Sequence, residues 1–323
     1  MMMEGYCLTK EELLKDLSAF EPAWKGKWEP APGMLDFEEK WESFHNPTGR
    51  LMICAHRGDI NIYYPENSLE GYLAAIEAGA DMLEIDVHTT ADGELVLMHD
   101  DTLTRTTNVS VLREAGENWL PPTDEIKDWT LAEIRRLRLV TKQKELTEYA
   151  VPTLREVITI AKDRVFVTLD KIDCFKWEDA YALIQEQNAY RTVLIPYNYD
   201  LEEVYAIQCR VRRETGYNMP FFAAVGIDGG IWSVEKLYYA SAFLKAHHMP
   251  PILRGGYHNL EDVEKLKPII SQLSKTHRIY AESMGAKRDF PETWESMLEM
   301  GYNVFMGNKL YDFLQIVKQR HFQ

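Results

Sequence analysis

The chain of 323 residues carries 51 acidic and 36 basic side chains, which gives a formal net charge of −15. This excess of negative charge argues against nonspecific binding to nucleic acids, whose phosphates it would repel. With 46% hydrophobic and 27% charged residues, the composition is typical of a soluble globular protein, and no apolar run approaches the roughly 18 residues of a membrane span.

The start of the chain and the cysteines predict the cellular location. The first residues lack the basic and apolar regions of a signal peptide. The cysteines, Cys7, Cys54, Cys174 and Cys209, show no C-x-x-C spacing. We therefore expect free thiols in a reducing, cytoplasmic compartment.

Residues 1–50 are expected to form short helices. Leu13, Leu14 and Leu17 share one stripe of a helix over 10–17, and a loop rich in Pro, Gly and Trp separates it from a second helix over 35–44. No pattern in this segment has a recognisable chemistry. Its aromatic residues indicate packing against the rest of the chain or, alternatively, an oligomer interface, so the oligomeric state stays open.

The next segment predicts a strand, a loop and a helix. The apolar run 51–55 indicates a buried strand that ends at His56-Arg57-Gly58. After a Pro-Glu-Asn turn at 65–67, apolar residues recur at helical spacing between an N-cap at Asn67 or Ser68 and a stop at Gly79. An imidazole and a guanidinium therefore lie at the C-terminal end of a strand.

A second strand is predicted over 81–88, and it carries Glu84 and Asp86 two residues apart. Side chains at this spacing share one face of a strand. Two neighbouring carboxylates repel each other unless one is protonated or a divalent cation binds both, and Mg²⁺ or Ca²⁺ suits oxygen ligands. A solvent-facing strand is the alternative, but the apolar neighbours Leu83, Ile85 and Val87 argue against it.

A third strand, predicted over 94–100, ends in His99-Asp100 as the first ended in His56. A single histidine is more often structural than catalytic. Two histidines at strand ends beside a carboxylate pair favour acid/base chemistry, because imidazole titrates near neutrality.

The ordered segments HRG, PEN, GADMLEIDVHTTADGELVLMHD and LTRTT resemble the signature of the glycerophosphodiester phosphodiesterase family. The resemblance is dense over 51–107 and extends more loosely through VPTLREVI and VFVTLD. It implies an α/β fold, a (β/α)₈ TIM barrel over 51–323, with residues 1–50 as an N-terminal helical extension packed on it. It also implies one divalent cation, Mg²⁺ or Ca²⁺, and cleavage of a small-molecule phosphodiester to a phosphomonoester and an alcohol.

The resemblance assigns roles to individual residues. It makes His56 and His99 the acid/base pair and places Arg57 on the substrate phosphate, with Glu84, Asp86 and Asp170 as the metal ligands. Asp170 ends a strand predicted over 165–170, on one face of that strand. The family pattern has Glu, one residue and then Lys, whereas here Lys171 follows Asp170 directly. We expect this lysine to point away from the metal, so a phosphate contact and a plain surface position both remain open.

The strand count poses a conflict. Only six residues separate His88 from Leu95, and the Asp92-Gly93 turn locally predicts a hairpin. The family resemblance favours two parallel barrel strands instead, and we adopt it. Nine strand candidates then compete for eight places, and 251–254, short and bounded by proline, is left out of the barrel wall. Two strand ends depart from the family pattern, at Glu282 and at Asn308, and these are expected to line the substrate pocket.

The sequence thus predicts a metal-dependent phosphodiesterase that acts on a glycerophosphodiester. A phospholipase-D-like or other non-glycerol activity on the same barrel is the alternative within enzymes. A noncatalytic barrel that binds a phosphate ligand is the alternative outside enzymes, and the presence of both His56 and His99 argues against it.

Overall fold

The computed structural model describes residues 36–58, 64–196, 200–224, 227–228, 231–232, 234–247, 249, 252–254, 267–268, 270–282 and 291–321. Its strands are β1 (Met52–His56), β2 (Met82–Thr89), β3 (Leu95–Leu97), β4 (Phe166–Asp170), β5 (Ala223–Ala224), β6 (Ile227–Asp228), β7 (Ile231–Trp232), β8 (Ile252–Arg254), β9 (Arg278–Glu282) and β10 (Val304–Gly307). Its helices are α2 (Phe37–His45), α3 (Leu69–Ala78), α4 (Val109–Glu114), η1 (Ile126–Asp128), α5 (Leu131–Ile134), α6 (Leu154–Ala161), α7 (Trp177–Gln187), α8 (Leu201–Thr215), α9 (Val234–Ala246), α11 (Pro291–Met300) and α12 (Leu310–His321).

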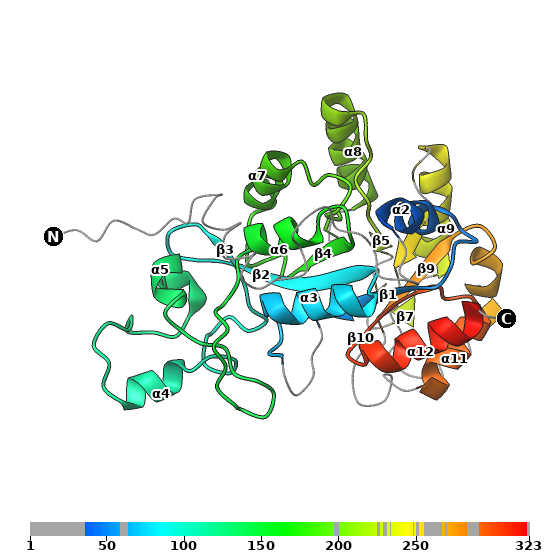
Figure 1. Cartoon of the computed structure of the whole chain (residues 1–323). Helices are drawn as coiled ribbons and strands as arrows, with labels where there is room; N and C mark the ends of the chain where they lie inside the picture. Colours follow the sequence, from blue (N-terminus) through cyan, green and yellow to red (C-terminus); the bar gives the residue numbers. More distant parts are fainter. Residues whose placement is uncertain are drawn as a thin grey trace.

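Parallel pairing closes the sheet into a ring. The order is β1, β2, β4, the segment 193–195, β5, β8, β9 and β10, and β10 pairs with β1 again. Helices surround this ring (Figure 1), and an apolar layer lies between helices and strands. The predicted (β/α)₈ barrel is therefore confirmed.

Local signals in the sequence set the helix ends. Ser68, rather than Asn67, caps α3 by accepting a hydrogen bond from the Gly71 amide at 3.1 Å. Gly79 ends the helix in the left-handed region at φ 108°, where a side chain would be strained. Thr153 and Glu156 form a capping box at the start of α6.

Helix α2 covers the N-terminal ends of the strands. The centroid of the Phe44 ring lies 4.6 Å from that of Phe166 and 5.6 Å from that of Phe222. The Lys40 ammonium donates to the carbonyls of Ala80 and Arg164, each at 3.0 Å and each just before a barrel strand. The helix expected over 35–44 is thus present and packs on one end of the barrel, while the helix expected over 10–17 lies outside the described residues.

Strand β3 is antiparallel to β2, so the prediction of two parallel neighbours is wrong. Val87 pairs with Leu97 and Thr89 with Leu95, and the Thr90 amide closes the turn on Glu94 at 2.9 Å. The Asp-Gly turn signal was correct, because so short a connection joins antiparallel strands. Omitting 251–254 from the wall was also wrong, since β8 pairs with both β5 and β9. The extra strand is β3.

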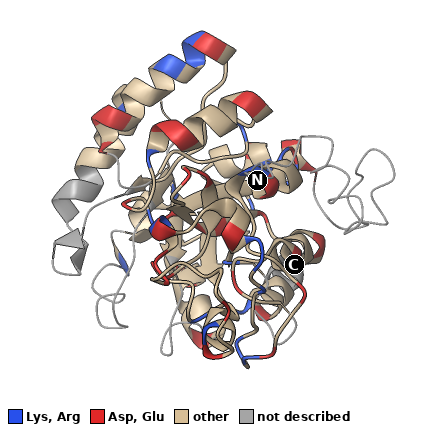
Figure 2. Ribbon diagram, turned by 90° about the vertical axis from the view of Figure 1, so that its left-hand side faces the viewer, with Lys and Arg blue, Asp and Glu red and all other residues tan. Residues whose placement is uncertain are grey.

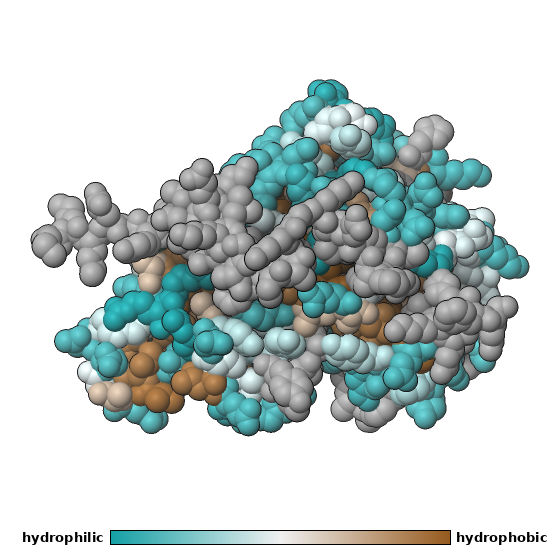
Figure 3. All heavy atoms as spheres, viewed as in Figure 1, coloured by the Kyte–Doolittle hydropathy of each residue, from teal (hydrophilic) through white to brown (hydrophobic). Residues whose placement is uncertain are grey.

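The chain makes its main excursion between β3 and α6. This part carries α4, η1 and α5 around a small apolar core, and it lies at the end of the barrel opposite α2 (Figure 1). Apolar side chains gather over α4 (Figure 3), where Val111 is 66% exposed. Figure 2 shows the molecule from this end, with both acidic and basic residues on its helices. Among the described residues no helix is both long enough and apolar enough to cross a membrane.

Candidate active site

Three carboxylates meet at the C-terminal ends of two neighbouring strands. Glu84 and Asp86 share one face of β2, and the strand register places Asp170 of β4 directly beside Asp86. One oxygen from each of the three carboxylates lies within 4.8 Å of the others. The arrangement expected from the sequence is therefore present in the geometry.

Two of these carboxylates are buried with unsatisfied oxygens. Glu84 is 3% exposed and Asp86 is 0% exposed. Within the described residues, Glu84 Oε1 and Asp86 Oδ1 have no hydrogen-bond partner. Burial, aided by the charges of Asp86 and Asp170, raises the pKa of Glu84 well above its usual range. A divalent cation fits this donor set, because it would satisfy these oxygens and keep the carboxylates ionised.

Arg57 holds the two buried carboxylates from the side of β1. Its amide donates to Glu84 Oε2 at 3.1 Å, and its Nε lies 3.1 Å from Asp86 Oδ2. Its guanidinium also donates to Glu66 Oε1 at 3.1 Å. Arg57 adopts a left-handed backbone, φ 57°, which is uncommon for a residue with a side chain and often found at functional sites. The Arg57 side chain is thus fixed by Asp86 and Glu66, and its backbone amide by Glu84.

The Pro-Glu-Asn turn supplies a residue to the site that the sequence analysis treated only as a possible helix cap. Asn67 donates from Nδ2 to Asp86 Oδ2 at 2.8 Å. Its Oδ1 accepts from the buried Tyr72 hydroxyl, which orients the amide. The signal was the turn motif itself, since its asparagine has a left-handed backbone at φ 56°.

His56 is oriented by a residue from the other end of the chain. Its Nδ1 lies 2.6 Å from Asn308 Oδ1, and its Nε2 lies 3.8 Å from Glu84 Oε2. Burial and the nearby Arg57 charge lower the pKa of His56 to about 4. Asn308 was expected to line the substrate pocket; it contacts the His56 imidazole, and its place in the pocket stays a prediction.

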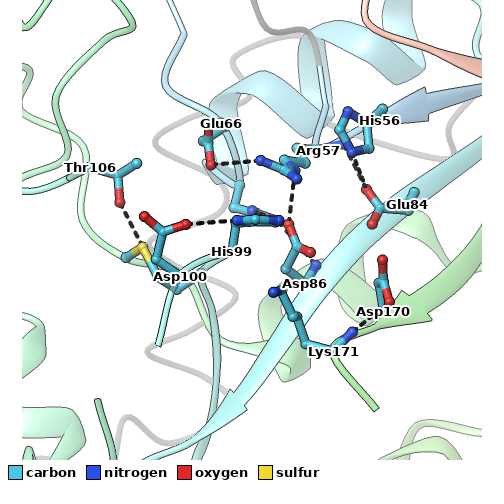
Figure 4. A network of polar contacts seen from close by, with 12 residues as sticks. His56, Arg57, Glu66, Glu84, Asp86, His99, Asp100, Thr106, Asp170 and Lys171 are labelled. Carbon is cyan, nitrogen blue, oxygen red and sulfur yellow. Dashed lines mark hydrogen bonds and ion pairs between the residues drawn. The ribbon is translucent and has the colours of Figure 1, made fainter. Parts of the chain in front are cut away.

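His99 reaches the same site through the hairpin. The Met98 amide donates to the Asp86 carbonyl at 3.0 Å, so the returning strand delivers His99 beside β2. His99 Nδ1 lies 2.7 Å from Asp100 Oδ1, and Figure 4 shows the ring between Asp100 and Asp86. The side-chain hydrogen bond from Arg105 is the main cause that lowers the pKa of Asp100.

Arg105 connects these groups into one network. Its guanidinium donates to Asp100 and, at 2.9 Å and 2.6 Å, to the two oxygens of Glu66. Glu66 also accepts a hydrogen bond from Arg57 (Figure 4). His99 and Arg57 are therefore linked through two acids and one arginine. The LTRTT motif contained the signal, but no spacing rule connects Arg105 with Glu66.

Lys171 and Glu282 complete the predicted site residues. Lys171 has φ 59°, its amide donates to Asp170 Oδ1 at 2.7 Å, and Figure 4 shows its side chain directed towards Asp86. The left-handed backbone sets the direction of this side chain, and its contact with the substrate phosphate stays a prediction. Glu282 ends β9, where Met306 of β10 is its pairing partner, and its side chain lies outside the described residues.

Comparisons with known proteins agree with this barrel and its motifs. Residues 56–194 match the model of the glycerophosphoryl diester phosphodiesterase family. A glycerophosphodiester phosphodiesterase of Caldanaerobacter subterraneus is 39% identical over 119 residues, which cover 36% of this chain and 43% of that protein. One from Bacillus subtilis is 36% identical over 118 residues, 34% of this chain and 36% of that protein. The matched segment thus spans less than half of these relatives.

Solved structures match over most of the chain and support the fold. A glycerophosphoryl diester phosphodiesterase from Parabacteroides distasonis has a TM-score of 0.66 at 22% identity, covering 89% of this chain and 93% of that one. An Oleispira antarctica phosphodiesterase in complex with the product sn-glycerol-3-phosphate has a TM-score of 0.56 at 17% identity, with 84% and 97% covered. Residues 56–194 therefore match the glycerophosphoryl diester phosphodiesterase family, and the chain shares the barrel fold of these solved structures.

Proposed function

We propose that the protein hydrolyses a glycerophosphodiester to glycerol phosphate and an alcohol, using a divalent cation held by Glu84, Asp86 and Asp170. The observation that carries this proposal is the meeting of three carboxylates within 4.8 Å, two of them buried, beside two histidines with different partners. The product named for the Oleispira relative supports the same substrate class.

The cation, Mg²⁺ or Ca²⁺, would neutralise the nonbridging phosphate oxygens as negative charge builds up on them. Arg57 and Lys171 add positive charge at the same place, which offsets the unfavourable net charge of −15 for an anionic substrate. Arg57 is positioned for this by Asp86 and Glu66. Its guanidinium presents several donors, so binding these two acids leaves others for a phosphate.

His56 serves as the general base in this proposal. The amide oxygen of Asn308 can only accept, so the proton of the neutral imidazole lies on Nδ1 and Nε2 keeps a free lone pair. A neutral partner does not favour the imidazolium. Nε2 can therefore take the proton of the attacking nucleophile, which is water or a neighbouring hydroxyl of the substrate.

His99 serves as the general acid. Its Nδ1 contacts the Asp100 carboxylate at 2.7 Å, and this charged partner orients the ring. Nε2 can then give its proton to the alkoxide that leaves when the P–O bond breaks. The network through Arg105 holds Asp100 in place for this task.

The test is hydrolysis of glycerophosphocholine by protein treated with EDTA, before and after Mg²⁺, Ca²⁺ or Mn²⁺ is added back. We expect no turnover without metal, recovery with at least one ion, and no recovery in Glu84→Gln or Asp86→Asn. Glu114→Gln, on the exposed surface of α4, is the matched control and should behave like the wild type. Full activity in EDTA would contradict the metal assignment.

The substrate is tested by a panel of glycerophosphocholine, glycerophosphoethanolamine, glycerophosphoglycerol and a lysophospholipid. We propose unequal rates, because Asn308 and Glu282 stand where relatives carry other residues. Phosphorus NMR on the same reactions reports a cyclic phosphate if the substrate hydroxyl is the nucleophile. Preference for the lysophospholipid would instead favour the phospholipase-D-like activity.

We also propose a cytoplasmic location. Cys54, Cys174 and Cys209 form no disulfide within the described part of the chain, which supports a reducing compartment. Fractionation of cells that express the full chain tests this location. Recovery of the protein in an oxidising compartment would contradict it.

A further inference from the structure

A second group of possible metal ligands lies just beyond the carboxylates. It consists of His88 on β2, Asp101 after β3 and Cys174 after β4, and their ligand atoms all lie within 4.8 Å of one another. His88 follows Asp86 by two residues on the same strand face, a step of roughly 7 Å along a strand. The strands β2 and β4, which carry the carboxylates, and the hairpin strand β3 thus each supply one member of this second group.

The distances fit a small tetrahedral ion. His88 Nε2 lies 4.0 Å from Asp101 Oδ1, and Cys174 Sγ lies 3.8 Å from the same oxygen. In a tetrahedral zinc site, with bonds of about 2.0–2.3 Å, ligand atoms lie roughly 3.3–3.8 Å apart. Side-chain movements of about half an ångström, within rotamer freedom, would therefore close the group on an ion.

His88 provides independent support for a ligand here. Its side chain is only 6% exposed, yet Nε2 has no hydrogen-bond partner within the part of the chain that is described. The ring is held by a hydrogen bond to the backbone of His99. Ligating histidines are commonly oriented by such a bond from the other ring nitrogen.

The backbone already holds Cys174 in place. Its carbonyl accepts from the Thr89 amide at 3.1 Å, and its amide donates to the Lys171 carbonyl at 2.7 Å. These two bonds place its thiol 3.8 Å from Asp101 Oδ1, within reach of an ion shared with His88.

We propose that His88, Asp101 and Cys174 bind one Zn²⁺ ion, distinct from the hard cation of the carboxylate site, with a fourth position open to water. The chemistry separates the two sites, because thiolate and imidazole favour zinc whereas three carboxylates favour Mg²⁺ or Ca²⁺. Binding releases the thiol proton. The ion ties the loops that carry His99 and Lys171 to β2, so it stabilises the mouth of the barrel.

Cobalt(II) in place of zinc tests this proposal by a signal that only sulfur ligands give. The full-length protein is stripped with EDTA, supplied with excess Mg²⁺ to occupy the carboxylates, and titrated with Co²⁺. We expect a sulfur-to-cobalt charge-transfer band that saturates at one equivalent and disappears when Zn²⁺ is added. Absence of this band in the wild type would overturn the proposal.

Variants separate the two sites. Cys174→Ser should abolish the band, and His88→Gln should weaken Co²⁺ binding by at least about tenfold. Two control variants should keep the charge-transfer band. Cys209→Ser changes a thiol outside the proposed site, and Glu84→Gln changes the carboxylate site and lacks hydrolytic activity in the proposed function. A band that survives Cys174→Ser, or that is lost in Glu84→Gln, contradicts a separate site. Circular dichroism checks that each variant is folded, and the conservative Cys174→Ser keeps the test valid if His88→Gln unfolds.

Discussion

Replacing Glu84 by glutamine should stabilise the metal-free protein and at the same time abolish its response to Mg²⁺ or Ca²⁺. The physical reason is that Glu84 and Asp86 are buried together, and Asp170 is within 4.8 Å of both. Without a cation these charges repel, or one carboxylate must bind a proton. Glutamine removes one charge and keeps an oxygen that can accept the Arg57 amide hydrogen bond.

The distances set the magnitude. Two unit charges at 4.8 Å repel by about 3.5 kcal/mol at an effective dielectric constant of 20. Protonating one carboxylate at pH 7 instead costs about 3–4 kcal/mol. The positive charge of Arg57 offsets part of the repulsion at Asp86. Asp170 is half-buried, so water screens part of its charge. We therefore expect Glu84→Gln to raise the free energy of unfolding of metal-free protein by about 1–3 kcal/mol at pH 8.

The pH dependence of stability independently tests the sign of the stability change predicted for Glu84→Gln. The pKa of Glu84 is raised in the folded protein, so the folded state binds more protons than the unfolded state above the unfolded pKa of about 4.3. The wild type thus loses stability, relative to the variant, as the pH rises through this window. The advantage of Glu84→Gln should be near zero at pH 4 and largest at pH 8.

Urea denaturation in EDTA at pH 4, 6 and 8 measures this difference, with Glu114→Gln as the exposed control. At Mg²⁺ concentrations of about 100 times its dissociation constant, the wild type should gain about 2.7 kcal/mol and Glu84→Gln should gain nothing. If Glu84→Gln is less stable than the wild type in EDTA at pH 8, Glu84 belongs to a satisfied polar network and the metal reasoning fails.

The remaining predictions concern the two histidines, the partner of His56 and the helix at the far end of the barrel. His56→Ala and His99→Ala should each lower kcat/KM by about 10²–10⁴, and the double variant should lose less than the product of the two losses, as steady-state kinetics would measure. Equal activity of His99→Ala and the wild type would remove His99 from the mechanism. Asn308→Ala should lower kcat by roughly 10–100-fold with little change in KM, because it frees the His56 ring; a change confined to KM would make Asn308 a substrate contact instead. Phe44→Ala should destabilise the protein by about 3–5 kcal/mol in denaturant and leave kcat at 25 °C unchanged, since Phe44 is fully buried at the end remote from the site.

Local patterns predicted which three carboxylates lie together. The two-residue spacing placed Glu84 and Asp86 on one face of β2, and the alternation in 165–170 placed Asp170 at the end of β4. Such rules work because side-chain direction in a strand depends only on the position along it. The kinetic and metal-binding experiments test the roles proposed for these side chains.

Long-range contacts were beyond these patterns. His56 meets Asn308 across 252 positions of the chain, and Arg105 meets Glu66 across 39. No periodicity predicts such a pair, because the pairing depends on how the ring of strands closes. The left-handed backbone at Lys171 was equally invisible, since a lysine gives no local signal for positive φ.

The hairpin at β3 is what allows a metal site to form between β2 and β4. Neighbouring strands lie about 4.8 Å apart, so a parallel β3 between these two would separate Asp86 from Asp170 by roughly 10 Å. An ion bound at about 2.0–2.6 Å from its ligands cannot bridge that distance. Because β3 folds back instead, β4 pairs directly with β2, and the same turn returns His99 to the carboxylates. Treating β3 as a wall strand was therefore incompatible with three carboxylates sharing one cation, and the Asp92-Gly93 turn is a requirement of the site.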